Sequence, residues 1–317
     1  MNQRDGVPYS ALAPLRQSYL ESTARERARG LCDVGTFTEW LDPRERTTSP
    51  HLAALDVPVA FDDGIVTGEG RLAQARIFVA AQEGRFMGGA VGEIHGAKLT
   101  GLLRRAAKEK PAAVVLLLET GGVRLHEANA GLVAISEIQR AVFDARHAGV
   151  PVIVLIGGGN GCYGGMGIVA RCCDAIVMSE AGRLSVSGPE VIETAHGVEE
   201  FDAKDRALVW RTMGGKHRYL LGEIDGFVDD DIHAFREAAT GFLDRPVPLD
   251  LDAVLAEHAY LADRIARFGA CGDALDIWTK LGVDDPSNVT ELDTAEFLAA
   301  TAHLRGTTNE DARDDAR

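Results

Sequence analysis

The sequence predicts an α/β fold in which a buried sheet is covered by helices. Two stretches, residues 113–127 and 150–167, each begin with a short run of Val, Ile and Leu and run out into glycines. Runs of this kind bounded by glycine are typical of strands buried on both faces of a layered domain. In the middle of the chain, segments follow a strand, strand, helix rhythm rather than strict alternation. These patterns predict a central sheet whose strands end in glycine-rich loops.

The composition is that of an ordinary globular protein. Of 317 residues, 46% are hydrophobic and 26% are charged, so enough apolar material is present for a sizeable core. The net charge of −15 argues against a nucleic-acid partner, because phosphates would be repelled over most of the surface. No apolar run approaches the roughly 20 residues of a membrane helix, and we expect no membrane contact.

The cysteine content indicates the redox environment. The five cysteines are odd in number and form no C-x-x-C pair, which indicates neither a disulfide framework nor a zinc ribbon. The amino-terminal segment has no continuous apolar stretch of the kind found in secretory signals. We therefore expect a cytoplasmic protein without a metal site.

The first part of the chain predicts helices around a hairpin region. Residues 9–31 are patterned as a charged amphipathic helix, and residues 33–41 carry two aromatic side chains at helical spacing, which predicts a docking helix. Short apolar runs over residues 57–92 alternate with Asp-Asp-Gly and Glu-Gly, which are hairpin signals. Residues 96–110 have one apolar face and predict a helix that Pro111 ends.

The second part of the chain predicts further strands and then mostly helices. An apolar stripe over residues 131–147 predicts a buried helix between the two key strands. A short helix is expected at 166–172, strands at 175–179 and 183–187, and a helix at 190–194 after Pro189. The remaining expected helices cover residues 205–213, 232–243, 251–268 and 295–303.

The two glycine loops predict a site built from main-chain N–H groups. The first contains Gly121 and Gly122, and the second contains Gly164 and Gly165 at the start of a helix. Glycine lets a ligand approach the backbone closely, and unpaired amides at a helix start favour negative charge. The first loop alone is better explained as a tight turn, and the second loop alone is weak evidence for a site. Two loops on nearby buried strands form a pair of donors, which favours a functional site.

A dinucleotide-binding motif is a competing interpretation of the second loop. Residues 159–164 match G-x-G-x-x-G after a strand, and Glu180 lies roughly where a ribose-binding acid would be. Two further glycines precede the match, which makes the turn longer than the usual strand-to-helix connection. The strand, strand, helix rhythm is also not that of a doubly wound sheet. An NAD-binding protein is therefore kept as a minor alternative.

Four motifs give the chain a resemblance to the carboxyltransferase branch of the crotonase-like superfamily. They are FDDGIVTGEG, GGVRLHE, GGMG and SVSGPEVIE, and the similarity runs over residues 33–231. The resemblance implies a ββα spiral fold with helical amino- and carboxy-terminal extensions. It also implies an oxyanion hole made of backbone amides from the two glycine loops. The tract MGGKHRYLLGEIDGFVDDD resembles the β subunits of biotin-independent malonate decarboxylases in particular.

With this resemblance, the chain divides into four expected parts. Residues 1–50 form a helical extension, and residues 51–245 form the crotonase-like carboxyltransferase-type domain. Residues 246–304 form carboxy-terminal helices. Residues 305–317 are charged and lack apolar anchors, which predicts a disordered tail.

The resemblance also implies an activity and a set of partners. The substrate would be a malonyl thioester on an acyl-carrier-protein subunit, held through a phosphoribosyl-dephospho-CoA arm, and the products would be the acetyl thioester and carbon dioxide. A γ subunit would supply the opposite wall of the site, and an α subunit would act as the acyl-carrier transferase. Neither a metal nor biotin is implied. The alternative is a carboxyltransferase subunit of a biotin-dependent decarboxylase or acyl-CoA carboxylase.

Four side chains near the loops are candidates for roles in this chemistry. Tyr163 and His126 are the nearest candidate proton donors, although a structural role is favoured for each. Arg124, at the GGxR position, is a candidate for contacting the thioester arm or for organising its loop, and we favour the loop. Lys98 is a further candidate for the arm, or is simply solvated.

Overall fold

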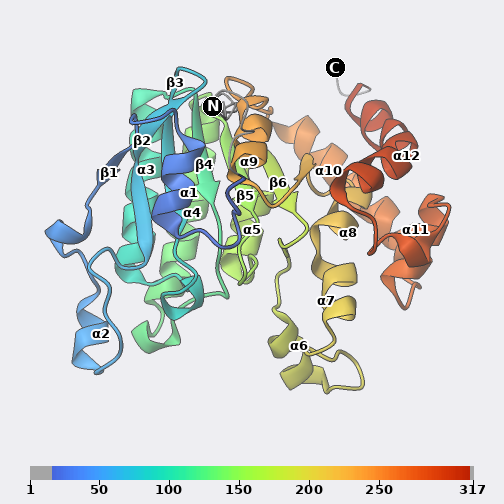
Figure 1. Ribbon diagram of the computed structural model, residues 1–317, viewed down its shortest axis with the longest axis horizontal. Coiled ribbons are helices and arrows are strands. Elements are labelled where there is room, and N and C mark those ends of the chain that lie inside the picture. Colours follow the sequence, from blue (N-terminus) through green and yellow to red (C-terminus); the bar gives the residue numbers. More distant parts are fainter. Residues whose placement is uncertain (1–15, 315–317) are drawn as a thin grey trace, which may run out of the picture.

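The computed structural model describes residues 16–314, with side chains described to residue 304, and contains one seven-stranded mixed sheet (Figure 1). The strands lie in the sheet in the same order as in the chain. The first two pairs, β1·β2 and β2·β3, are antiparallel, and β3 to β7 are parallel. The strands are β1 (Thr38–Trp40), β2 (Ile65–Leu72), β3 (Ala75–Gln82), β4 (Ala113–Leu117), β5 (Val152–Ile156), β6 (Ala175–Ser179) and β7 (Gly226–Val228).

Helices cover both faces of the sheet, which explains why every residue of β4, β5 and β6 is buried (Figure 1). On one face, α3 and α4 share a core with Val114 and Leu116; on the other, α1 and α9 share a core with Val115 and Leu117. The helices are α1 (Ala24–Leu31), α2 (Pro50–Ala54), α3 (Glu93–Glu109), α4 (Ala130–His147), α5 (Gly165–Arg171), α6 (Pro189–His196), α7 (Arg206–Met213), α8 (Gly215–Leu220), α9 (Ile232–Thr240), α10 (Leu251–Phe268), α11 (Ala274–Leu281) and α12 (Thr294–Asp314).

Single β-bridges preserve the strand, strand, helix rhythm between the main strands. After β4, Thr120 bridges Cys162, which follows β5, and Cys162 in turn bridges Leu184, which follows β6. Each of these segments lies between a main strand and the next helix. The repeating unit is therefore a long strand, a bridging segment and a helix, which confirms the predicted α/β crotonase-like class. The strand predicted at 183–187 is wrong, because only single bridges form there.

Several amino-terminal predictions are corrected. The predicted docking helix at 33–41 contains the edge strand β1 instead, in which Trp40 pairs with Thr67 of β2. Of the predicted helix at 9–31, residues 9–15 lie outside the described residues and α1 begins only at Ala24, after the capping residue Thr23. The hairpin between β2 and β3 turns at residues 73–74, both with positive φ, rather than at a glycine dipeptide.

After β7 the chain is mostly helical, as predicted, but the helical part does not end at residue 304. Helix α12 continues to Asp314 through most of the predicted tail, and residues 315–317 lie outside the described part. The sequence analysis also missed α11, whose Trp278 is buried against the core. Across residues 16–314, none of the helices combines the length and apolar character needed to cross a bilayer.

Candidate functional site

The two glycine loops lie side by side beyond the carboxyl ends of β4 and β5. The Thr120 amide donates to the Gly161 carbonyl oxygen at 2.8 Å, and the Tyr163 amide donates to the Thr120 carbonyl oxygen at 2.9 Å. A Cβ atom placed on Gly164 would lie 3.2 Å from the Cα atom of Gly122. The backbones of the two loops are therefore in contact, as the paired glycine clusters predicted.

The amides of the first loop are already bonded within the protein. The Gly121 amide donates to the Gly88 carbonyl oxygen at 2.9 Å, and the Gly122 amide donates to the Thr120 hydroxyl oxygen at 3.1 Å. Both donors are occupied in this structure. The geometry of this structure therefore gives no support to Gly121 and Gly122 as oxyanion donors, because local turn bonds use their N–H groups.

The second loop does present free donors. The Gly164 amide donates to the Val186 carbonyl oxygen at 2.9 Å, so its N–H group is also engaged in this structure. By contrast, the amides of Gly165 and Met166, the first two residues of α5, have no acceptor among the residues that the structure describes. Such first-turn amides carry the partial positive charge of a helix start. Of the four predicted amides, Gly165 alone remains available to an oxyanion.

Arg124 is a structural residue of the first loop. Its side chain is completely buried, and its guanidinium donates to the Asp63 carboxylate at 2.7 Å, to the Asp63 carbonyl oxygen at 2.8 Å and to Glu127 at 3.2 Å. It has no surface to offer to a substrate arm. These contacts are those expected of a residue that organises the loop, which stays the favoured role of Arg124.

Lys98 is likewise engaged inside the protein. Its ammonium group donates to the carbonyl oxygens of Leu41, Asp62 and Ile65 at 3.2, 3.0 and 2.8 Å. Burial lowers the pKa of this group. The side chain borders a cavity of about 700 Å³, but all three of its donors are used by the backbone. The predicted contact of Lys98 with a thioester arm therefore gains no support from this geometry.

The two candidate proton donors lie in different environments. His126 is exposed on a short 3-10 turn, Leu125–Glu127. Tyr163 is 4% exposed, and its hydroxyl has no hydrogen-bond partner among the described residues. Burial raises the pKa of Tyr163, so the hydroxyl stays protonated at neutral pH and keeps a proton to donate. Tyr163 belongs to the second loop and contacts the first through its backbone amide, which donates to the Thr120 carbonyl oxygen.

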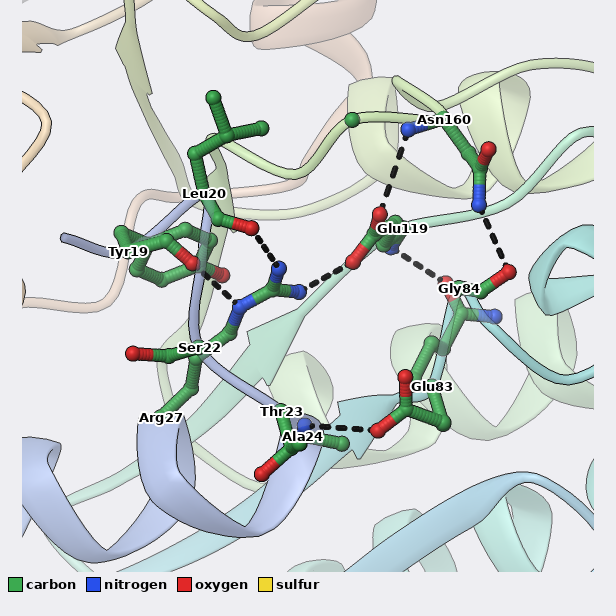
Figure 2. Close-up of polar contacts among 12 residues, drawn as sticks. Tyr19, Leu20, Ser22, Thr23, Ala24, Arg27, Glu83, Gly84, Glu119 and Asn160 are labelled. Carbon is green, nitrogen blue, oxygen red and sulfur yellow. Dashed lines mark hydrogen bonds and ion pairs between the residues drawn. The ribbon is translucent and has the colours of Figure 1, made fainter.

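A buried carboxylate at the base of the loops was missed by the sequence analysis. Glu119 lies just beyond the end of β4, directly before Thr120. It pairs with Arg27 of α1 and accepts a hydrogen bond from the Asn160 amide at 3.2 Å (Figure 2). It therefore links the amino-terminal helix to both glycine loops. The only signal in the sequence is an acidic residue at the end of an otherwise apolar strand.

Large apolar side chains are exposed after the first loop, in α5 and in the segment after β6. Where exposed apolar side chains are contiguous, they mark interaction sites. Their exposed fractions range from 44% to 84%. The residues are Leu125, Leu132, Val133, Ile168, Val186 and Val191.

The dinucleotide alternative gains nothing from the structure. Residues 157–164 separate β5 from α5, which is longer than a tight strand-to-helix turn. The strand order never reverses, so the sheet has no topological switch point. Glu180 pairs with Lys216 at 2.9 Å beside a second cavity, of about 310 Å³. Within the described residues, no three His, Cys, Asp or Glu side chains are grouped to hold a metal ion.

The chain matches the carboxyl transferase domain family over residues 20–246. Because this match covers more than half of the chain, the protein belongs to that family. It is 42% identical over 309 residues to the malonyl-S-ACP:biotin-protein carboxyltransferase MADC of Malonomonas rubra, and the match covers 91% of this chain and 97% of that protein.

Solved structures give the same result. The fold is similar to a chain of the Pseudomonas malonate decarboxylase hetero-tetramer in complex with malonate, with a TM-score of 0.78 and 37% identity over 84% of this chain and 98% of that one. It is also similar to a chain of the Pseudomonas MdcD–MdcE hetero-dimer, with a TM-score of 0.64 and 36% identity over 82% and 99% of the two chains. These relatives confirm the resemblance to malonate decarboxylase subunits.

Proposed function

We propose that this chain is the β-type subunit of a malonate decarboxylase and acts on a malonyl thioester carried by an acyl-carrier-protein subunit. The carrier would hold its substrate through a phosphoribosyl-dephospho-CoA arm. The family membership and the similarity to malonate decarboxylase chains support this proposal. The observation that carries it is the contact between the two glycine loops, with the Gly165 amide left free beside it.

The reaction breaks the bond between the carboxylate carbon and the methylene carbon of the malonyl group. Its electron pair moves into the thioester, whose carbonyl oxygen becomes an enolate oxygen while carbon dioxide leaves. We infer that the amides of Gly165 and Met166 donate to that oxygen, where removal of one preorganised donor typically costs about 2.7–4 kcal/mol of barrier. No nucleophile is needed for this step.

The carbanion carbon must then take a proton, and Tyr163 is the residue we propose as its source. The neutral hydroxyl is buried and unpartnered, so no internal hydrogen bond competes for its proton. It belongs to the same loop as Gly165, two residues away. A bound thioester at the α5 amides would therefore lie next to the segment that carries this group.

The exposed apolar side chains after the first loop, in α5 and after β6 support a partner that covers the site. We propose a γ subunit as that partner, with the carrier subunit and its acyl-carrier transferase α subunit completing the assembly. The apolar cover would also weaken the solvation of the substrate carboxylate, which favours loss of carbon dioxide.

A biotin-dependent pathway is the second candidate. It is supported by the printed name of the Malonomonas rubra relative, which describes transfer from malonyl-S-ACP to a biotin protein. In that case carbon dioxide would be passed to biotin rather than released.

Reassembly of the complex tests the proposal. The chain alone should be inactive, and addition of the γ and carrier subunits should give acetyl thioester and free carbon dioxide. Activity that survives avidin would favour the biotin-independent reaction, and loss of activity with avidin would favour the biotin-linked one. Absence of malonyl-thioester cleavage in the complete complex would contradict both.

A further inference from the structure

The side chain of Glu119 fills a space that two glycines leave open. A Cβ atom on Gly158 would lie 2.3 Å from the Glu119 carboxyl carbon, and one on Gly84 would lie 2.4 Å from it. Neither glycine has positive φ, so the backbone conformation does not require glycine there. Gly84 follows β3 and Gly158 follows β5, the two strands that flank β4. The segments after β3 and β5 therefore both have a glycine next to the Glu119 carboxylate, which leaves room for it.

The carboxylate is fixed from several directions. Glu119 is 6% exposed, and its amide donates to the Gln82 side-chain oxygen at 3.0 Å. Its partner Arg27 is also buried and donates to the carbonyl oxygens of Tyr19 and Leu20 at 2.7 and 3.2 Å (Figure 2). The guanidinium is thus oriented independently of the ion pair. Arg27 presents a positioned charge to Glu119.

The same carboxylate holds the second loop. It accepts from the Asn160 amide at 3.2 Å, and the Asn160 side chain donates to the Gly84 carbonyl oxygen at 2.8 Å (Figure 2). Asn160 lies five residues before Gly165, and Glu119 lies directly before the first loop. Glu119 is therefore joined to the first loop through the chain and to the second loop through the hydrogen bond from Asn160.

We propose that Glu119, held by Arg27, is a positioning residue that sets the second glycine loop against the first and so places the Gly165 amide. A buried ion pair contributes little net stability compared with apolar packing, which leaves geometric definition as its main effect. Misplacement of a donor by about 1 Å can cost on the order of 100-fold in rate. Only the kinetic part of this inference depends on the proposed function.

The first test compares two buried carboxylates. Glu119→Gln keeps the shape but removes the charge that Arg27 needs. Asp174→Asn does the same to the buried Arg146–Asp174 pair, where Asp174 accepts from the Val152 amide at the start of β5, the other end of the strand from the loops. Hydrogen exchange is measured in the full chain over residues 118–124 and 157–165. We expect faster exchange in both segments for Glu119→Gln and unchanged exchange for Asp174→Asn.

The kinetic arm uses the reassembled complex. We expect Glu119→Gln to lower kcat about 10- to 100-fold with little change in KM, and Asp174→Asn to keep kcat. Equal exchange in the loops of the wild-type protein and of Glu119→Gln would overturn the inference, whatever the activity. An inactive wild-type complex would instead count against the proposed function, and the exchange result would still decide the role of Glu119.

A second pair of variants tests the same inference if Glu119→Gln does not fold. Gly158→Ala pushes a Cβ atom against the Glu119 carboxylate without removing any charge. A Cβ atom on Gly159 would lie 3.5 Å from Leu20 and 3.8 Å from the Glu119 carboxylate, both ordinary contacts. We expect increased loop exchange in Gly158→Ala and wild-type exchange in Gly159→Ala. The same exchange in both variants would overturn the inference.

Discussion

The Cα atom of Gly122 lies 3.2 Å from where a Cβ atom of Gly164 would be, so the two glycine loops touch through their backbones. Gly164 also has φ of 65° and ψ of −144°, a combination that side chains strongly disfavour. Contact between the loops and the conformation of Gly164 are thus two independent reasons for glycine at this position.

Gly164→Ala is therefore expected to lower the free energy of unfolding by about 1–3 kcal/mol through backbone strain and to lower the activity of the complex. Urea denaturation and turnover measure the two effects. Gly101→Ala is the matched control, since a Cβ atom there meets nothing within 4 Å on helix α3 and should stabilise the protein by up to about 1 kcal/mol. A Gly164→Ala variant as stable and active as the wild type would contradict the argument.

Loss of Arg124 should be strongly destabilising. Arg124→Met leaves the buried carboxylates of Asp63 and Glu127 without their cation, and breaking a buried pair in this way typically costs about 3–5 kcal/mol. Arg104→Met removes the exposed pair with Glu137 and should cost no more than about 1 kcal/mol. Denaturant titration of both variants checks the contrast. Equal losses would argue against Arg124 as the anchor of the first loop.

Tyr163→Phe should separate stability from activity. The mutation deletes a buried hydroxyl with no partner, so the free energy of unfolding should stay the same or rise. If the hydroxyl delivers the proton, product formation should slow about 100-fold or more, as is typical for loss of a general acid. Thermal unfolding and single-turnover formation of the acetyl thioester are the measurements. Unchanged turnover would transfer the protonation step to water or to another group.

Two buried histidines predict a loss of stability in mild acid. Burial lowers the pKa of His95 and that of His217 from 6.5 to about 3. Between pH 6.5 and about pH 3, the unfolded chain binds protons on these histidines that the folded chain does not. The free energy of unfolding therefore falls as the pH decreases. The limiting slope is about 1.4 kcal/mol per pH unit for each histidine.

Urea titrations between pH 6.5 and 5 measure this dependence, above the range where most carboxylates titrate. His95→Gln should reduce the slope by up to about 1.4 kcal/mol per pH unit, the effect of one proton. His147 is exposed, so His147→Gln should leave the slope unchanged. Identical slopes for the wild type and for His95→Gln would show that His95 does not carry the effect.

The main strands and long helices could be predicted because their signals are local. The apolar runs of β4 and β5 and the stripe of α4 need no information about distant residues. The edge strand β1 could not be predicted this way. Its conformation depends on pairing with β2, as in Trp40 with Thr67, and its aromatic spacing resembles that of a helix.

The site was predictable only in part for the same reason. Clustered glycines mark Gly122 and Gly164 in the sequence, but whether an amide is free depends on acceptors such as the Val186 carbonyl oxygen, which lies in another segment. Glu119 was missed because its setting is made by Arg27 and Gly158, both distant in the chain. The local sequence pattern therefore predicts where the glycine loops are, and tertiary contacts decide which of their amides are free to donate a hydrogen bond.

The most direct measurement is kcat of the reassembled complex carrying Gly165→Pro or Gly165→Ala. Both variants add a Cβ atom near Ile135, and proline is well accepted at the first position of a helix, but only proline removes the N–H group. We expect kcat of Gly165→Pro to fall about 10²- to 10³-fold below that of Gly165→Ala. Equal kcat values in the two variants would contradict the assignment of the Gly165 amide to the enolate oxygen.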